Sequence, residues 1–237
     1  MSTEALSPDA VPVALLIVLT VTTGIVDAVS VLALGHVFTA NMTGNVVFLG
    51  FALAGAPEFS LKRSGFALIS FLAGAAGGGQ MASRMAAKPV DDWVGRALIV
   101  EGVLMLAAAA ACTACPGRLD DTSGTVAIVI CLTALAMGFR NATVRRLGVA
   151  DLTTTLLTLT LTGLAADSYL AGGTNPRWRR RTASILGMFA GGFSGVFLLK
   201  ISVALALGVS GLVSTVCAAF LKRRSLNLSV ISNRSAL

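Results

Sequence analysis

The sequence has little charge, one histidine and one tyrosine. Only 12% of its 237 residues are charged, whereas 55% are hydrophobic and the mean hydropathy is +0.85. These values lie far outside the range of soluble domains, so a soluble catalytic domain is excluded. A chain of this length holds about six to eight membrane segments of roughly 20 residues each. We therefore predict an all-α integral membrane protein that forms a single membrane domain over residues 1–237.

The residues that usually hold metals or carry out acid-base chemistry are also scarce. The four cysteines lie in or beside apolar runs, and the only histidine, His36, lies far from all of them in the sequence. Cys112 and Cys115 are spaced as C-x-x-C, but within an alanine-rich apolar run rather than after a strand. Without a convincing nucleophile and base pair we expect no enzyme, no metal site and no cofactor.

The N-terminal ten residues contain Glu4 and Asp9 but no Lys or Arg, so a cleaved signal peptide is not expected and the first helix should remain as an anchor. The net charge of +7 comes from basic residues in the links between apolar segments and in a basic tail at 222–237. Such charge fixes membrane orientation. We expect a multi-pass protein of the bacterial cytoplasmic membrane with both termini cytoplasmic. Its expected partners are the lipid bilayer and a small solute, without nucleic acid, and a homo-oligomer is left open.

The apolar segments form two similar series, which predict an internal duplication with repeats at 11–115 and 124–221. The first series is 11–35, 45–56, 64–85 and 93–115, and the second is 125–148, 152–166, 182–199 and 201–220. Individual residues correspond as well: Gly24 and Asp27 match Gly138 and Asn141, and Gly50 matches Gly163; at one constant spacing, Arg63, Phe71, Gly74 and Gly77 match Arg181, Phe189, Gly192 and Gly195.

The second segment of each series, 45–56 and 152–166, is short for a membrane span. If both are half-helices or re-entrant segments, the chain crosses six times and the repeats are inverted. If both are full spans, it crosses eight times and the repeats are parallel. Six spans place every Lys and Arg except Lys62, Arg63, Arg118 and Lys200 on one side, which fits the positive-inside rule better than the eight-span alternative.

Glycines spaced four residues apart occur in both series, at Gly74 and Gly78 and at Gly191 and Gly195. This small-x-x-x-small spacing predicts close packing of membrane helices. A phosphate-binding loop is not expected, because no Gly-Lys-Ser or Gly-Lys-Thr follows.

The residues around the first short segment resemble a known family. The pattern is Gly24, Asp27-Ala28, Leu34-Gly35 and Val37-Phe38-Thr39-Ala40-Asn41-Met42-Thr43-Gly44-Asn45, with a weaker echo at Met137-Gly138-Phe139-Arg140-Asn141-Ala142 and Thr160-Leu161-Thr162-Gly163. It resembles the YoaK-like family of bacterial multi-pass membrane proteins over essentially the whole chain. The resemblance implies six spans and lends no substrate. Because the echo lacks Met-Thr-Gly-Asn, a site built from both halves is expected to be asymmetric.

Polar residues precede both short segments and are candidates for a solute site. Hydroxyls, amides and helix N-terminal NH groups at membrane depth can partner broken backbone and face a polar solute. The alternative is that they only cap and join helices. The candidates in these tracts are Thr39, Asn41, Thr43, Asn45, Thr154, Thr155 and Thr158, and the two tracts are expected to meet.

Two carboxylates, Asp27 and Glu101, fall well inside predicted spans, and an intramembrane carboxylate is a functional hypothesis by default. Asp27 corresponds to Asn141, beside Arg140. It is either a proton or cation site, or it forms a structural ion pair with Arg140 or another cation. The site prediction therefore adds Asp27, Asn141 and Glu101. The predicted function is a transporter or channel for a small polar or charged solute; the alternative is a non-transporting scaffold or lipid-responsive protein.

Overall fold

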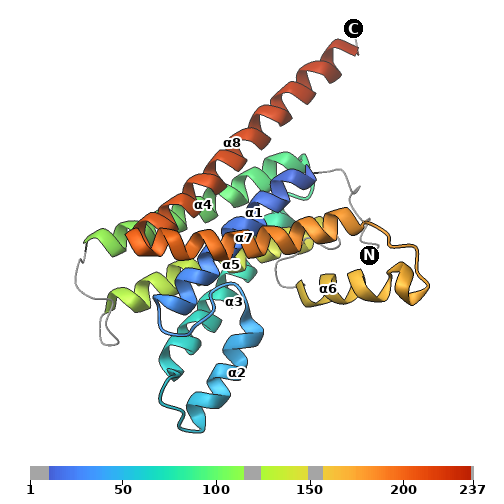
Figure 1. The fold of residues 1–237 in the computed structure, drawn as a ribbon. Helices are drawn as coiled ribbons and strands as arrows, with labels where there is room; N and C mark the ends of the chain where they lie inside the picture. Colours follow the sequence, from blue (N-terminus) through green and yellow to red (C-terminus); the bar gives the residue numbers. More distant parts are fainter. Residues whose placement is uncertain (1–10, 115–123, 149–156, 236–237) are drawn as a thin grey trace.

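The computed structural model describes residues 11–114, 124–148 and 157–235, with side chains up to residue 227, and this part of the chain is helical without strands (Figure 1). The helices are α1 Val13–Leu32, α2 Met42–Leu53, α3 Leu61–Arg84, α4 Val90–Ala114, α5 Gly124–Leu147, α6 Leu157–Ala166, a short 3-10 turn Tyr169–Ala171, α7 Trp178–Ile201 and α8 Val203–Ser235.

Six of the described helices are long and apolar enough to cross a membrane: α1, α3, α4, α5, α7 and the part of α8 up to Asn227. They have 20 to 25 residues in these apolar stretches, whereas α2 and α6 have 12 and 10. A span needs about 20 residues. The predicted all-α membrane fold with six spans is therefore confirmed.

The register of each packed helix pair gives its direction. Residue numbers rise together along the contacts of α1 with α7 and of α3 with α5, so these pairs are parallel, whereas α4 and α8 are antiparallel. The contacts are Gly187 with Ile17 and Gly195 with Ala28, Gly74 with Leu135 and Gly78 with Phe139, and Gly95 with Ala218 and Gly211 with Met105.

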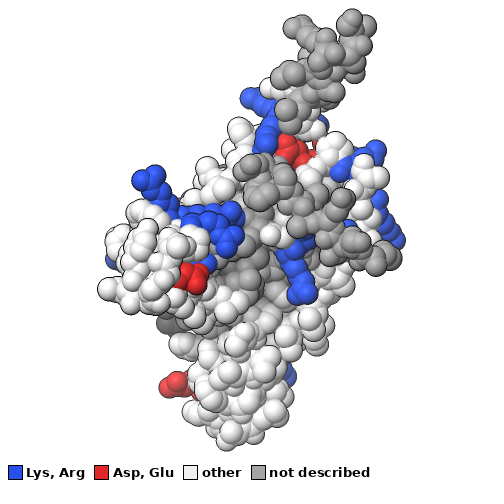
Figure 2. Space-filling view, turned by 90° about the vertical axis from the view of Figure 1, so that its right-hand side faces the viewer, with Lys and Arg blue, Asp and Glu red and all other residues white. Residues whose placement is uncertain are grey.

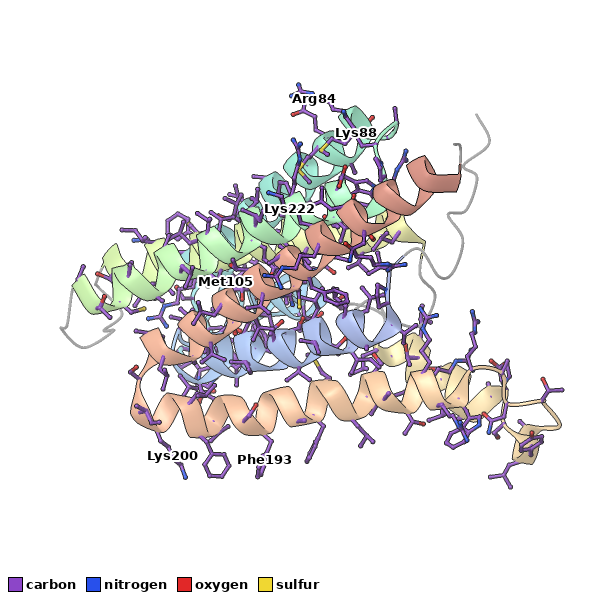
Figure 3. The ribbon with its side chains drawn as sticks, turned by 90° about the horizontal axis from the view of Figure 1, so that it is seen from above. Arg84, Lys88, Met105, Phe193, Lys200 and Lys222 are labelled. Atoms are coloured by element: carbon purple, nitrogen blue, oxygen red, sulfur yellow. The ribbon has the colours of Figure 1, made fainter. Side chains whose placement is uncertain are left out.

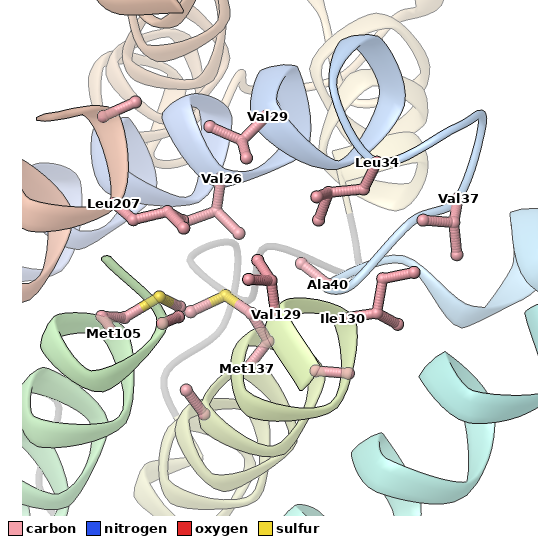
Figure 4. Close-up of a cluster of buried hydrophobic side chains, with 14 of the residues drawn as sticks. Val26, Val29, Leu34, Val37, Ala40, Met105, Val129, Ile130, Met137 and Leu207 are labelled. Atoms are coloured by element: carbon pink, nitrogen blue, oxygen red, sulfur yellow. The ribbon is translucent and has the colours of Figure 1, made fainter. Parts of the chain in front are cut away.

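Two apolar clusters lie at different levels of the bundle. The Leu98 cluster joins the beginnings of α1 and α4 to the ends of α3 and α5 and to the middle of α8. Its members are Val11, Leu15, Leu16, Leu19, Ala82, Trp93, Val94, Leu98, Leu147, Cys217, Ala218 and Leu221. The Val129 cluster (Figure 4) joins the opposite helix ends, and its main members are Val26, Val29, Leu34, Val37, Met105, Val129, Ile130, Met137 and Leu207. Thus α1 ends and α3 begins at the same level of the bundle, which favours six spans over eight.

Close contacts of helix glycines with the backbone of a neighbouring helix occur in matching pairs in the two halves of the chain. An added Cβ on Gly74 would collide with the Leu135 carbonyl oxygen, and one on Gly191 with the Val21 carbonyl oxygen. Close packing at Gly74, Gly78, Gly191 and Gly195 is thus confirmed. The contacts correct one detail, because Gly74 corresponds in packing to Gly191 and not to Gly192. These matched contacts support the duplication, which stays a prediction.

The outer faces of α3 and α7 carry the side chains that would meet lipid. On α7, Phe189, Phe193 and Phe197 form an exposed row, and Nζ of Lys200 lies 4.9 Å from the centre of the Phe197 ring. Figure 3 shows Phe193 and Lys200 pointing away from the bundle, on the edge opposite Arg84 and Lys88. Gly187, Gly191 and Gly195 of α7 are buried against α1, so one side of this helix packs on protein and the other faces lipid.

Candidate functional site

A buried polar layer lies between the two apolar clusters, where α1, α4, α5 and α8 converge. Its centre is Arg140 of α5, which is 3% exposed. Nε of Arg140 donates to Oε2 of Glu101 on α4 over 2.7 Å, and Nη2 donates to Oε1 of the same carboxylate. The two planar groups therefore meet through two hydrogen bonds, the strongest geometry for this type of pair.

The remaining donors of Arg140 reach α1 and α8. Nη1 donates to the Leu19 carbonyl oxygen and to Oγ1 of Thr23, both over 2.8 Å. Nη2 also lies 2.9 Å from Oγ1 of Thr22 and 3.3 Å from Oγ of Ser214. A guanidinium has five N–H donors. With Nε and both terminal nitrogens engaged, the whole guanidinium is partnered within the protein.

The hydroxyls around Arg140 are oriented by their own helices. Oγ1 of Thr22 and Oγ1 of Thr23 both donate to the Leu19 carbonyl oxygen, so their lone pairs remain available to Arg140. Oγ of Ser214 contacts both the Ser210 carbonyl oxygen and Oε1 of Glu101. The layer is therefore a connected network rather than a lone ion pair, and such networks can stabilise more than their separate pairs suggest.

The energetics of this layer depend on both charges being present. Glu101 is 0% exposed, and removing two such charges from water costs several kcal/mol per ion. Their attraction and the hydroxyl contacts offset that cost. Loss of either partner would leave an unpaired charge in the membrane interior.

A cavity of about 10 Å³ lies directly beside the ion pair. Its walls are formed by Glu101, Arg140 and Thr143 together with the apolar side chains Leu16, Leu19, Val94, Ala97, Leu98, Val144 and Leu147. That volume suits about one water molecule. The cavity lies on the side of the Leu98 cluster, so a small molecule next to the pair would be on that side.

The opposite side of the ion pair is filled by apolar side chains. Figure 4 shows Met105 and Met137 pointing toward one another, with Val26 and Leu207 nearby. At the sequence spacing that separates Gly24 from Gly138, Arg140 corresponds to Val26 and Thr23 to Met137. The polar layer therefore has apolar residues at the corresponding positions of the other half.

Asp27 is not the partner of Arg140. Its Oδ1 is buried and has no hydrogen-bond partner among the described residues, and the carboxylate that pairs with Arg140 is that of Glu101. The structural pairing of Asp27 with Arg140 in particular is therefore wrong. Asp27 as a proton or cation site stays a prediction.

The Thr39 to Asn45 tract forms a local turn at the start of α2. Oδ1 of Asn45 accepts from the Phe38 backbone N–H over 2.9 Å, and its Nδ2 donates to the Phe38 carbonyl oxygen. The Asn45 amide is thus used by the backbone that enters α2. Oγ1 of Thr39 is buried without a partner among the described residues, whereas Asn41 and Thr43 are exposed.

The described short helices α2 and α6 do not meet. In Figure 1, α2 lies at the bottom, against α3, and α6 lies at the right, against α7. Each short helix packs on the long helix that follows it, and the expectation that the two polar tracts form one site stays a prediction because most of the second tract lies outside the described residues. Thr158 is exposed on α6, and Nδ2 of Asn141 donates to the Met137 carbonyl oxygen of its own helix. Thr154 and Thr155 lie outside the described residues.

Of the predicted site residues that the structure describes, only Glu101 belongs to the polar layer. Sequence reasoning missed Thr22, Thr23 and Ser214, because hydroxyls in apolar helices are common and the sequence does not show which of them face inward. It considered Arg140 only as a partner for Asp27. The sequence feature that could have identified the site is Arg140 itself, a basic residue seven positions before the end of the apolar helix α5. Within the described ranges, no three His, Cys, Asp or Glu side chains come together to hold a metal, and the absence of a metal site stays a prediction.

A bundle of six helices that are long and apolar enough to cross a membrane is the fold of a multi-pass membrane protein, and this bundle encloses a charged pair. The chain belongs to the family described as Protein of unknown function (DUF1275), whose model matches residues 15–220. It is 36% identical over 157 residues to UPF0700 transmembrane protein YoaK of Bacillus subtilis (strain 168). That match covers 65% of each chain, slightly less than two thirds of the relative's length. The YoaK-like resemblance is confirmed, and no solved structure matches.

Proposed function

We propose that this protein transports a small polar or charged solute across the bacterial cytoplasmic membrane, with the Arg140 and Glu101 layer as its binding site. The observation that carries the proposal is the position of this pair. It is buried between two apolar clusters, at the junction of four membrane helices from both halves of the chain. A charged group at such a depth is costly, and charged groups at membrane depth usually mark solute pathways.

The two apolar clusters lie on either side of the Arg140 and Glu101 layer, which is the arrangement expected for the closed state of a transporter. An alternating-access transporter binds its solute near mid-membrane and opens one side at a time, and inverted repeats supply two related arrangements for this. The matched contacts of Gly74 with Leu135 and of Gly191 with Val21 support such a relation between the halves.

The distribution of cations supports an orientation with both termini in the cytoplasm. The Leu98 cluster marks one end of the bundle, where α3 and α5 end and α7 begins, and most Lys and Arg residues lie at this end; Lys62, Arg63 and Lys200 lie at the other. Figure 2 shows groups of Lys and Arg above a lower lobe that is nearly free of charge and corresponds to α2 and the start of α3. The positive end is cytoplasmic under the positive-inside rule.

The second candidate is a scaffold without transport. The complete hydrogen bonding of Arg140 favours it, because such a network also suits a structural lock between helices. Membrane-embedded catalysis is not proposed. Flux in proteoliposomes separates the two candidates: reconstituted protein is compared with empty liposomes for radiolabelled or dye-reported uptake of small anions, cations and neutral polar solutes. Uptake of any one class above the empty liposomes supports transport, whereas no uptake by correctly folded protein supports the scaffold.

A further inference from the structure

The charge balance of the buried layer restricts which solutes can bind there. Arg140 and Glu101 carry opposite unit charges, so the closed site is neutral. A solute that binds must replace an existing partner, because the guanidinium is fully hydrogen-bonded in this state. Whether the solute replaces Arg140 or Glu101 in the ion pair determines the charge that the solute must carry.

A cation is disfavoured at this site. It would have to replace Arg140 at the Glu101 carboxylate, and an arginine side chain stays protonated in proteins. The displaced guanidinium would then remain charged in an enclosed layer without a carboxylate, with only the Leu19 carbonyl oxygen and the hydroxyls of Thr22, Thr23 and Ser214 around it. A neutral solute would likewise leave both charges separated and less well paired.

An anion can bind without leaving an unpaired charge. It takes the place of Glu101 at the guanidinium, and the released Glu101 carboxylate accepts one proton from the same bulk solution that supplies the anion. Before binding the site holds Arg140 with one positive charge and Glu101 with one negative charge; afterwards it holds charged Arg140, the anion and neutral Glu101. The site is neutral in both states, which matters in a medium where isolated charges cost several kcal/mol.

The shape of the site favours a small planar oxyanion. The guanidinium presents a planar fork that matches carboxylate geometry, and Glu101 already uses this fork through both carboxylate oxygens. The neighbouring cavity of about 10 Å³ admits little more than a water molecule, so a bulky solute has no room in this state. In the part of the chain that the structure describes, Cys217 of α8 is the other titratable group close to the pair, and the remaining polar neighbours are hydroxyls and the Leu19 carbonyl oxygen.

We infer that the transported solute is a small planar oxyanion, such as a monocarboxylate or nitrate, that crosses together with one proton carried by Glu101. This inference rests on the proposed transport function and assigns its substrate class and coupling. Net movement of one anion and one proton is electroneutral, so an applied membrane potential should not drive it.

The test uses full-length protein in liposomes that contain a pH-reporting dye. Nitrate and pyruvate are the probes because both cross bare lipid slowly; chloride, potassium and glycerol are the comparison solutes. The inference predicts nitrate or pyruvate uptake with matching acidification of the lumen. A pH gradient should increase this uptake at least tenfold, and a potassium diffusion potential should leave it unchanged.

Glu101→Gln tests the assigned proton carrier, since glutamine keeps the shape but cannot accept the proton. Uptake driven by the pH gradient should fall at least tenfold. Added nitrate should raise the Tm of this variant, because the Arg140 guanidinium then gains an anion. If the variant does not fold, the potential dependence of the wild type still decides the coupling.

Each of the other possible outcomes would refute one part of the inference. Transport of potassium or glycerol without nitrate or pyruvate would refute the oxyanion while leaving transport intact. Anion uptake that carries charge, or that Glu101→Gln leaves unchanged, would refute the proton coupling. No flux of any solute by folded protein would refute the transport function itself.

Discussion

Arg140 and Glu101 lie 39 residues apart in the chain, yet Nε of Arg140 is 2.7 Å from Oε2 of Glu101, and both side chains are almost fully buried. The pair joins α5 to α4 across the boundary between the two halves of the chain. Thr22 and Thr23 extend the contact to α1, and Ser214 extends it to α8. The site is therefore a tertiary feature that no single segment contains.

The ion pair predicts strong coupling between its two substitutions. Arg140→Met or Glu101→Gln alone should lower the free energy of unfolding by about 3–5 kcal/mol, because each leaves an uncompensated buried charge. The double variant should regain most of that loss, since both charges are gone. Unfolding of the four proteins in detergent micelles measures the coupling. Single variants as stable as the wild type would contradict this account of the layer.

The helix register predicts different effects at two neighbouring glycines of α7. An added Cβ on Gly191 collides with the Val21 carbonyl oxygen, whereas one on Gly192 has open space. Gly191→Ala should therefore cost about 1–3 kcal/mol through forced separation of the helices. Gly192→Ala should stay within about 1 kcal/mol of the wild type and on the stabilising side. Thermal unfolding compares the two, and equal effects would show that the packing register is wrong.

The turn before α2 predicts a structural role for Asn45. Asn45→Leu removes both contacts with the Phe38 backbone and should cost about 1–3 kcal/mol for the groups left without partners. Thr43→Val is the control, since Thr43 is exposed on the same helix. Any flux by the folded Asn45→Leu protein should keep the solute preference of the wild type. A changed solute preference would indicate that the tract from Thr39 to Asn45 is part of the solute site.

The six-span arrangement predicts that the residues before and after α2 lie on one side of the membrane. Single cysteines replace His36, Glu58 or Lys88 in a protein whose four native cysteines are changed to serine; His36 and Glu58 flank α2, and Lys88 follows α3. A membrane-impermeant thiol reagent applied to oriented vesicles should label His36→Cys and Glu58→Cys from one side and Lys88→Cys from the other. Labelling of His36→Cys and Glu58→Cys from opposite sides would instead require α2 to span the membrane.

The sequence predicted the fold better than the site, for a physical reason. Length and apolarity determine which segments can span a membrane, and these are local properties, so the six spans and the glycine contacts of Gly74 and Gly191 could be predicted. The partners of a buried charge depend on helix rotation and crossing, which the sequence does not give. Pairing of Arg140 with Asp27 was therefore one of the hypotheses from the sequence, because Asp27 corresponds to Asn141, the residue next to Arg140; the bundle instead brings Arg140 to Glu101.

The polar tract shows a second limit. Thr39, Asn41, Thr43 and Asn45 are close in sequence, but the helix that begins at Met42 turns Asn45 inward and leaves Asn41 and Thr43 exposed. Clustering in the sequence therefore did not produce clustering in space. The hydroxyls that do gather come from α1 and α8, which are far apart in the chain.

The most direct test of the central claim is solute flux by the double variant Arg140→Met with Glu101→Gln, compared with the wild type in the same proteoliposomes. The double variant removes the charged layer while avoiding an unpaired buried charge, and a thermal unfolding curve verifies that it is folded. If the layer is the binding site, the folded double variant should lose the flux that the wild type shows. Equal flux by the two proteins would contradict the claim and place the solute path elsewhere in the bundle.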